Sequence, residues 1–241
     1  MNLARVRIEL NKTASPKKAR TLESFFKTGP GQYGEGDRFI GVTAPNLRKI
    51  AGACEGLSYR ELAELLRSEI HEERALALLV LVAHYQKNHK KKNTAGQEQV
   101  YRFYFKHLSR VNNWDLVDGS AGQIVGAHLA SKDKAALHKL AVSQNLWERR
   151  ISIVATLPWV RAGRLDDTLR LAKKLLGDRH DLMHKAVGWC LREVGKKDLF
   201  ALENFLRKNR GRIPRTALRY AIEKFPEKKR KAYLKRVGKI N

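Results

Sequence analysis

Nearly every segment of this sequence has the spacing of an amphipathic helix, and no segment shows the apolar–polar alternation that would predict a strand. One predicted helix begins at Pro45 and another begins after Ser58. The other predicted helices span residues 16–26, 72–88, 97–108, 113–129, 132–142, 146–160, 166–176, 181–195, 198–208, 214–224 and 227–237. Short helices with short joints favour stacked antiparallel pairs, and the spacing between pairs is roughly 35 to 40 residues, as in helical repeats. We therefore predict an all-α helical-repeat solenoid in which residues 1–241 form a single domain.

The net charge of the chain limits the classes of molecule that it is expected to bind. Lys and Arg number 49 against 24 Asp and Glu, a formal net charge of +25. Such a surplus favours polyanions, with nucleic acid first and an anionic membrane surface second. A solenoid has one continuous concave face, and a concave face lined with Lys and Arg would fit around a duplex. We therefore expect a basic concave face that binds DNA.

Several features bear on location and assembly. No apolar run approaches the ~18 residues of a membrane span, and the first ten residues lack the apolar region of a signal peptide. Cys54 and Cys190 are the only cysteines, too few for a disulfide scaffold or a cysteine zinc site. We expect a cytoplasmic monomer, nucleoid-associated if bacterial, that does not bind membranes.

Two segments are predicted to be non-helical. Residues 27–41 are glycine-rich and should form an ordered loop, whereas residues 86–96 should form a solvated basic turn. Gly29–Gly34 fits the G-x-G-x-x-G pattern, but no strand precedes it, so a tight loop is the better interpretation. His180–His184 superficially resembles a zinc helix but lacks a third ligand. We expect no metal and no cofactor.

The residues most suggestive of chemistry lie at the start of the predicted helix 113–129. Asn113 is a natural N-cap, and Asp115 is an acid in the first turn, so both have structural explanations. Asp118 lies a turn further in, at i+4 from Trp114. A carboxylate has the wrong charge for gripping phosphate but suits a site where positive charge develops on bound nucleic acid. The simpler alternatives are that Asp118 is a surface acid or the partner of an arginine, and that Trp114 is a core residue.

A second candidate surface lies on the predicted helix 181–195. Its polar stripe places a Trp among basic groups, at Lys185, Trp189, Arg192 and Lys196. Basic groups interleaved with an aromatic ring suit phosphates and a base or sugar. The alternative is a Trp that is merely shielded by lysine stems.

Three further arginines are candidates for contacts with DNA. Arg150 lies on a partly apolar face and needs an anionic partner, which could be Asp118, another acid or a DNA phosphate. Arg215 and Arg219 follow Pro214 at i and i+4, so they share a helix face.

Four segments together carry a resemblance to a known family: Phe39–Pro45 (FIGVTAP), Asn113–Asp118 (NWDLVD), Asn145–Arg150 (NLWERR) and Lys185–Glu193 (KAVGWCLRE). In these motifs the chain resembles the AlkD-like DNA glycosylases of the DNA alkylation repair family. The resemblance implies a HEAT-like, all-α solenoid that holds duplex DNA in its concave face. It also implies hydrolysis of the N-glycosidic bond of N3- and N7-alkylated purines without a metal or cofactor.

The family's functional residues are carried over by position. Trp114, Asp118 and Trp189 match its catalytic trio, Arg150 matches its active-site arginine, and Arg192 matches a DNA-contacting basic residue. We expect the DNA-binding surface to extend to Lys185, Lys196, Arg215 and Arg219. The absence of an obvious catalytic lysine favours a monofunctional enzyme. Two alternatives stay open, namely a non-catalytic binder of branched or distorted DNA with the same fold, and an adaptor for an acidic protein.

Overall fold

The computed structural model describes residues 1–235, and the regular secondary structure of this range is helical. The only strand-like pairing in this range is an isolated bridge between Arg38 and Ile70. The predicted all-α helical-repeat fold is therefore confirmed. The chain divides into two compact units, residues 1–128 and residues 129–241.

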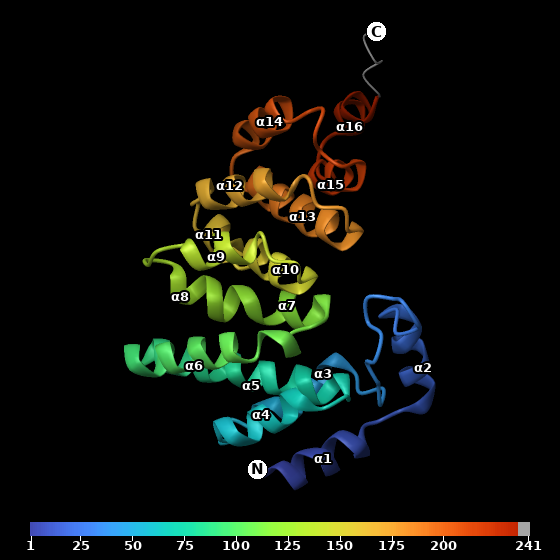
Figure 1. Ribbon diagram of the computed structural model, residues 1–241, viewed down its shortest axis with the longest axis vertical. Coiled ribbons are helices and arrows are strands. Elements are labelled where there is room, and N and C mark those ends of the chain that lie inside the picture. The colour runs from blue at the N-terminus through green and yellow to red at the C-terminus, as the bar shows by residue number, and fades with distance from the viewer. Residues whose placement is uncertain (236–241) are drawn as a thin grey trace. The chain divides into compact units, whose positions relative to one another are not determined.

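The first unit is built around one long central helix, α5 (His71–Lys90). The helices that pack against it are α3 (Ala44–Gly52), α4 (Tyr59–Arg67), α6 (Thr94–Lys106) and α7 (Trp114–Ala121). This arrangement can be followed in Figure 1, and it explains why α5 is buried on most of its sides. The remaining elements are α1 (Leu3–Lys12), α2 (Pro16–Phe25), the 3₁₀ turn η1 (Leu108–Arg110), the π-helical segment η2 (Gly122–Gly126) and the short α8 (Ala127–Leu129).

Local signals set where these helices begin. The Ser15 side chain accepts a hydrogen bond from Lys18 N and is followed by proline at the first helical position. Ser58 and Glu61 form a reciprocal capping box at the start of α4. These are backbone needs that a single side chain can satisfy, which is why the helix starts can be predicted from sequence.

The glycine-rich segment between α2 and α3 is an ordered loop, as predicted, and α5 anchors it. The buried carboxylate of Glu72 accepts hydrogen bonds from three successive backbone amides, those of Ile40, Gly41 and Val42. Gly41 has a φ of 81°, and a Cβ there would lie 2.2 Å from the carbonyl oxygen of Ser15. The loop is therefore held closely between α2 and α5.

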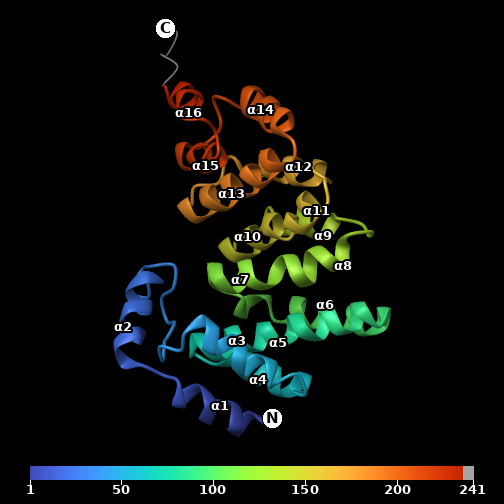
Figure 2. The same ribbon diagram turned by 180° about the vertical axis from the view of Figure 1, so that it is seen from behind.

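The second unit also surrounds one long helix, α13 (Asp181–Lys197). Its neighbours are α10 (Leu146–Val154), α11 (Leu157–Arg161), α12 (Asp166–Leu175), α14 (Leu199–Lys208) and α15 (Arg215–Ala221). The other two helices are α9 (Ala135–Leu140) and α16 (Glu227–Leu234). Figure 2 shows α12 and α15 against α13. A Cβ at Gly188 would lie 2.5 Å from the carbonyl oxygen of Ala217, so this glycine permits the close approach of α15.

Four features differ from the predictions. α1 forms outside the predicted helices, because Asn2 caps it and only Val6 and Leu10 are buried, which leaves a weak apolar pattern. The predicted helix 146–160 is two helices, since Pro158 has no N–H and cannot continue α10. The predicted turn 86–96 is mostly helical, because α5 runs to Lys90. The predicted helix 227–237 ends at Leu234, and residues 236 and 237 lie outside the described range.

Candidate functional site

The start of α7 places two of the predicted site residues one turn apart. The Asn113 side chain accepts a hydrogen bond from Trp114 N at 2.8 Å, which begins the helix as the sequence predicts. Trp114 and Asp118 then follow at i and i+4, and both are half-buried. An indole ring and a carboxylate are thus presented on one face of a single helix.

Aromatic rings hold Trp114 in place. Its ring stacks on Phe26, with centroids 5.0 Å apart and planes at 9°, and Phe26 stacks in turn on Phe39 at 5.0 Å. Phe25 meets Trp114 edge-on at 5.8 Å and is itself 61% exposed. Trp114 therefore lies at the edge of an aromatic layer, beside an exposed ring.

A buried network of charges lies next to this layer. The two ring nitrogens of His71 lie 3.0 Å from Asp37 Oδ2 and 2.7 Å from Asp115 Oδ2. The other oxygen of Asp37 accepts from Arg74, and Asn113 Nδ2 donates to Asp37 Oδ2 at 3.0 Å. The network therefore joins the glycine-rich loop, α5 and the N-cap of α7.

The contacts within this network shift the pKa values of His71 and Asp37. Burial opposes the charged form of His71, but the hydrogen bonds to Asp115 and Asp37 outweigh it and raise the pKa of His71 to about 9. Burial also opposes ionisation of Asp37, yet the hydrogen bond from His71 and the charge of Arg74 hold the pKa of that carboxyl below its ordinary value. His71 is therefore protonated and Asp37 ionised at neutral pH.

The helix changes geometry one turn after Asp118, at Gly122. η2 is a π-helical segment, and single π-helical turns within α-helices are frequent at functional sites. Ser120 Oγ lies 3.0 Å from the hydroxyl of the buried Tyr104 and donates to the carbonyl of Leu116 at 2.5 Å. Burial raises the pKa of Tyr104, and the negative charge of Asp118 adds to that rise. Tyr104 is therefore a neutral phenol of α6 at physiological pH.

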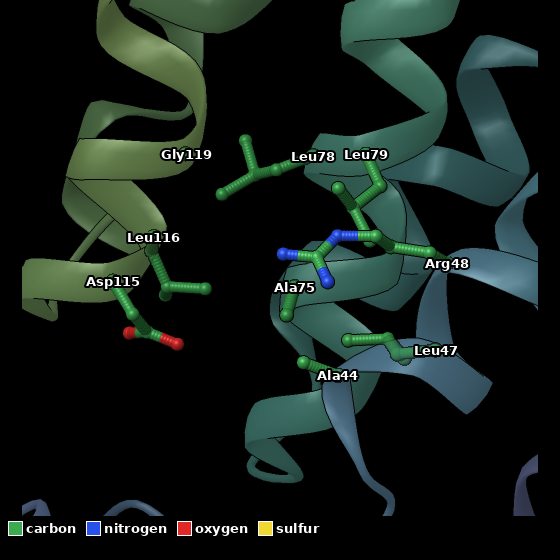
Figure 3. Close-up of a pocket in the computed structure, with 9 residues that line it drawn as sticks. All are labelled: Ala44, Leu47, Arg48, Ala75, Leu78, Leu79, Asp115, Leu116 and Gly119. Carbon is green, nitrogen blue, oxygen red and sulfur yellow. The ribbon is translucent and has the colours of Figure 1, made fainter.

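A cavity of about 190 Å³ opens beside α7, between that helix, α3 and α5 (Figure 3). Leucine side chains form its apolar walls, at Leu47, Leu78, Leu79 and Leu116. Its two charged groups are Arg48, whose guanidinium extends across the opening, and Asp115. The second carboxylate of α7, that of Asp115, thus lies at the edge of this cavity.

The remaining predicted residues lie in the second unit. Arg150 is only 5% exposed, and its Nη1 donates to the carbonyl of Leu182 at 2.7 Å in the first turn of α13. Trp189 is half-buried on α13 and makes no aromatic ring contact with any residue of the described range. Within residues 1–235, Trp114 is thus packed by other rings of its unit, whereas Trp189 has no aromatic ring contact.

Salt bridges link the basic stripe of α13 to nearby acids. Lys185 pairs with Asp181 at 2.8 Å, and Lys196 pairs with Glu193 at 2.7 Å. Arg192 pairs with both Glu193 and Glu223. On α15, Arg215 donates to the carbonyl of Leu234 at 3.1 Å, and Arg219 is exposed. Each basic side chain of the predicted stripe on α13 therefore has an acidic partner within the protein.

Comparison with known proteins places the chain in a family. Residues 6–225 match the family of DNA alkylation repair enzymes. The chain belongs to the DNA alkylation repair enzyme family. A solved structure described as a predicted DNA alkylation repair enzyme from Enterococcus faecalis has 16% sequence identity and a TM-score of 0.64, covering 89% of this chain and 98% of its own. That likeness shows a shared fold, and no curated protein matches the chain.

The charged network of this DNA alkylation repair family member is not among the features predicted from the sequence. Asp37 lies in the glycine-rich loop and His71 begins α5, and neither stood out as a candidate. Asp115 was explained by its first-turn position alone, whereas the structure adds its ion pair with His71. The only sequence signal was a cluster of charged residues, His71–Arg74, directly before the apolar run of residues 75–83.

The described part of this family member was searched for metal sites and for membrane-spanning helices. No group of three or more His, Cys, Asp or Glu side chains within residues 1–235 is arranged to hold a metal ion. No helix in the same range is long and apolar enough to cross a membrane.

Proposed function

We propose that this protein is a monofunctional DNA glycosylase that hydrolyses the N-glycosidic bond of N3- and N7-alkylated purines in duplex DNA. The observation that carries the proposal is the pairing of a half-buried carboxylate, Asp118, with the ring of Trp114 on one face of α7 in a chain of net charge +25. Membership of the DNA alkylation repair family supports it.

Cleavage of the N-glycosidic bond is favoured by a negative charge close to the deoxyribose. An alkylpurine of this kind is cationic and already a good leaving group, and its departure builds oxocarbenium character on the deoxyribose. The carboxylate of Asp118 would stabilise this positive charge and orient the attacking water. Because the charge is greatest in the transition state, Asp118 would accelerate bond cleavage more than it strengthens binding.

Two tryptophans would contact the damaged nucleotide. Trp114 and Trp189 would pack on it and favour its positive charge, each contact contributing about 0.5–2 kcal/mol. The aromatic layer under Trp114 fixes its ring before DNA arrives, so little side-chain freedom would be lost on binding.

The basic side chains would hold the backbone of the duplex. We assign this role to Arg150, Lys185, Arg192, Lys196, Arg215 and Arg219. Their contacts with phosphates would set the register of the DNA without distinguishing one base sequence from another. Most of them already pair with acids or carbonyls. Binding would therefore exchange partners, and it should weaken steeply with salt.

The decisive test is a duplex with a single N7-methylguanine and direct detection of the released base. Asp118→Asn keeps the shape of the side chain and removes its charge. We expect excision to fall by roughly a hundredfold or more, the scale of losing one preorganised electrostatic group. Binding to undamaged duplex should stay level or tighten, because a repulsion with phosphate is removed.

The matched control is Glu55→Gln, which removes one exposed negative charge from the same unit and should leave excision unchanged. If Asp118→Asn and the wild type excise at the same rate, the assignment of Asp118 is wrong. If the wild type releases no base but binds a four-way junction tightly, the protein is a non-catalytic binder of branched DNA instead.

A further inference from the structure

His71 is held in a way that defines its protonation state by geometry. Each of its ring nitrogens lies within hydrogen-bond distance of a carboxylate oxygen, at 3.0 Å from Asp37 and 2.7 Å from Asp115. An ionised carboxylate only accepts hydrogen bonds, so both nitrogens must donate, and the ring is an imidazolium. Together with Arg74, two positive charges then balance two negative ones.

The ring of His71 reaches the candidate site by two routes. Through its Nε2 it holds Asp115, the neighbour of Trp114 in the first turn of α7. Through its faces it contacts Phe39 at 4.5 Å and Phe26 at 5.1 Å, and Phe26 is the ring on which Trp114 stacks. A shift of the His71 side chain would therefore reach Trp114 both through Asp115 and through Phe26.

We propose that His71 is a positioning residue that fixes the start of α7 by bridging Asp37 and Asp115, and thereby places Trp114 and Asp118. Its consequence for base excision rests on the proposed function, but its effect on Trp114 does not. His71 is only 2% exposed, so it acts through these neighbours without touching DNA. Within the described residues the other oxygen of Asp115 has no hydrogen-bond partner, which makes His71 the group that holds this carboxylate.

The charged groups around the ring come from every element packed against it. Asp37 faces it from the loop, Arg74 from its own helix and Asp115 from α7, while Arg110 of η1 lies near Arg74 and Asp37. Phe26 and Phe39 add only apolar rings. The hydrogen bonds raise the pKa of His71 to about 9 against the effect of burial. Above that pH the ring keeps a single N–H, so one of its two bridges is lost.

Fluorine NMR on protein labelled with 5-fluorotryptophan tests the proposal. The protein has four tryptophans, and Trp114→Phe identifies the Trp114 resonance by its loss. In His71→Gln we expect the Trp114 resonance to move or broaden, and excision of N7-methylguanine at pH 7.5 to fall by roughly ten- to a hundredfold. Affinity for undamaged duplex should hardly change, because the basic surface is intact.

The matched control is His128→Gln, which removes another buried histidine of the same unit that pairs with a carboxylate, Glu98, at 3.1 Å. It should leave the Trp114 resonance in place. The double variant His71→Gln/Asp115→Asn should recover part of the lost excision, because it removes the carboxylate that the first change left without its partner. An additive loss in the double variant would contradict the bridge.

A pH titration of the wild type decides the matter if His71→Gln does not fold. The Trp114 resonance should move with the same midpoint as the His71 ring, near pH 9, and Asp115→Asn should lower that midpoint. A Trp114 resonance indifferent to both the titration and the substitution would overturn the proposal. If the wild type excises no base, the proposed function fails, while the NMR results still decide the positioning role.

Discussion

Each unit of this protein is organised around a long helix that starts at a histidine, and the two histidines behave in opposite ways. His71 begins α5 and places both ring nitrogens against carboxylates, so its pKa is raised to about 9. His180 caps α13, and its Nδ1 accepts a hydrogen bond from Leu182 N at 3.1 Å. Burial is the main reason that the pKa of His180 falls below its ordinary value of 6.5. Burial therefore favours the neutral ring in both residues, and the carboxylate partners of His71 outweigh it.

The difference follows from what each partner needs. A carboxylate can only accept, so it favours a protonated ring, whereas a backbone N–H at a helix start must donate and therefore requires a ring nitrogen without a proton. The first unit consequently depends on a charged histidine at α5, and the second on a neutral one at α13. We therefore expect the stability contributed by His71 to be lost at alkaline pH and the stability contributed by His180 to be lost at acidic pH.

The largest expected effect is at the carboxylate that His71 shares with Arg74. Asp37→Asn removes the charge of a 3% exposed side chain and leaves His71 and Arg74 as buried cations. We expect the free energy of unfolding to fall by about 3–5 kcal/mol, as when one partner of a buried ion pair is removed. Chemical denaturation measures it. Asp181→Asn at the exposed start of α13 breaks a surface pair with Lys185 and weakens a hydrogen bond with Thr216, and it should cost less than about 1 kcal/mol.

Next in size is the dependence of stability on alkaline pH. Because the folded pKa of His71 is raised from 6.5 to about 9, its contribution is fully present below pH 6.5 and is lost as the pH rises through 9. The shift corresponds to about 3 kcal/mol. Denaturation curves between pH 6 and pH 10 should show this loss in the wild type and a smaller one in Asp115→Asn. A wild-type stability that is flat over this range would show that His71 is not charged in the folded protein.

A smaller effect is expected from the tryptophan of the second unit. Trp189→Ala should lower excision by roughly tenfold, the scale of one cation–π contact, and change the thermal midpoint little, because the ring is half-buried. Trp114→Ala should lose more stability, since it removes a ring stacked on Phe26. If Trp189→Ala instead loses several kcal/mol of stability, Trp189 is a core residue.

The smallest effect is expected at His180. His180→Ala removes the cap of α13 and should cost about 1 kcal/mol at pH 8. The folded pKa of His180 is lowered, so the stabilisation by the neutral ring is present above pH 6.5 and is lost as the pH falls below it. The gap between wild type and variant should therefore narrow at pH 5. An equal gap at both values would mean that the ring does not act as a hydrogen-bond acceptor.

Local spacing explains which site residues the sequence could reveal. Trp114 and Asp118 are four positions apart, so helical geometry alone puts them on one face. The same rule predicted the stripe through Lys185, Trp189 and Arg192, although it could not show that Glu223 on another segment pairs with Arg192. Asp115 illustrates the limit, because its first-turn position is a sufficient explanation until its ion pair with His71 is seen.

The sequence by itself determined the all-α repeat character, most helix starts, the basic charge and the Trp114–Asp118 pair, because each depends on composition or on contacts within one or two turns. Only the tertiary structure decided the protonation of His71, which lies 34 residues from Asp37 and 44 from Asp115. No periodicity connects residues at such separations. Their charge states depend on burial and on partners brought from other elements, and those exist only once the loop, α5 and α7 have packed together.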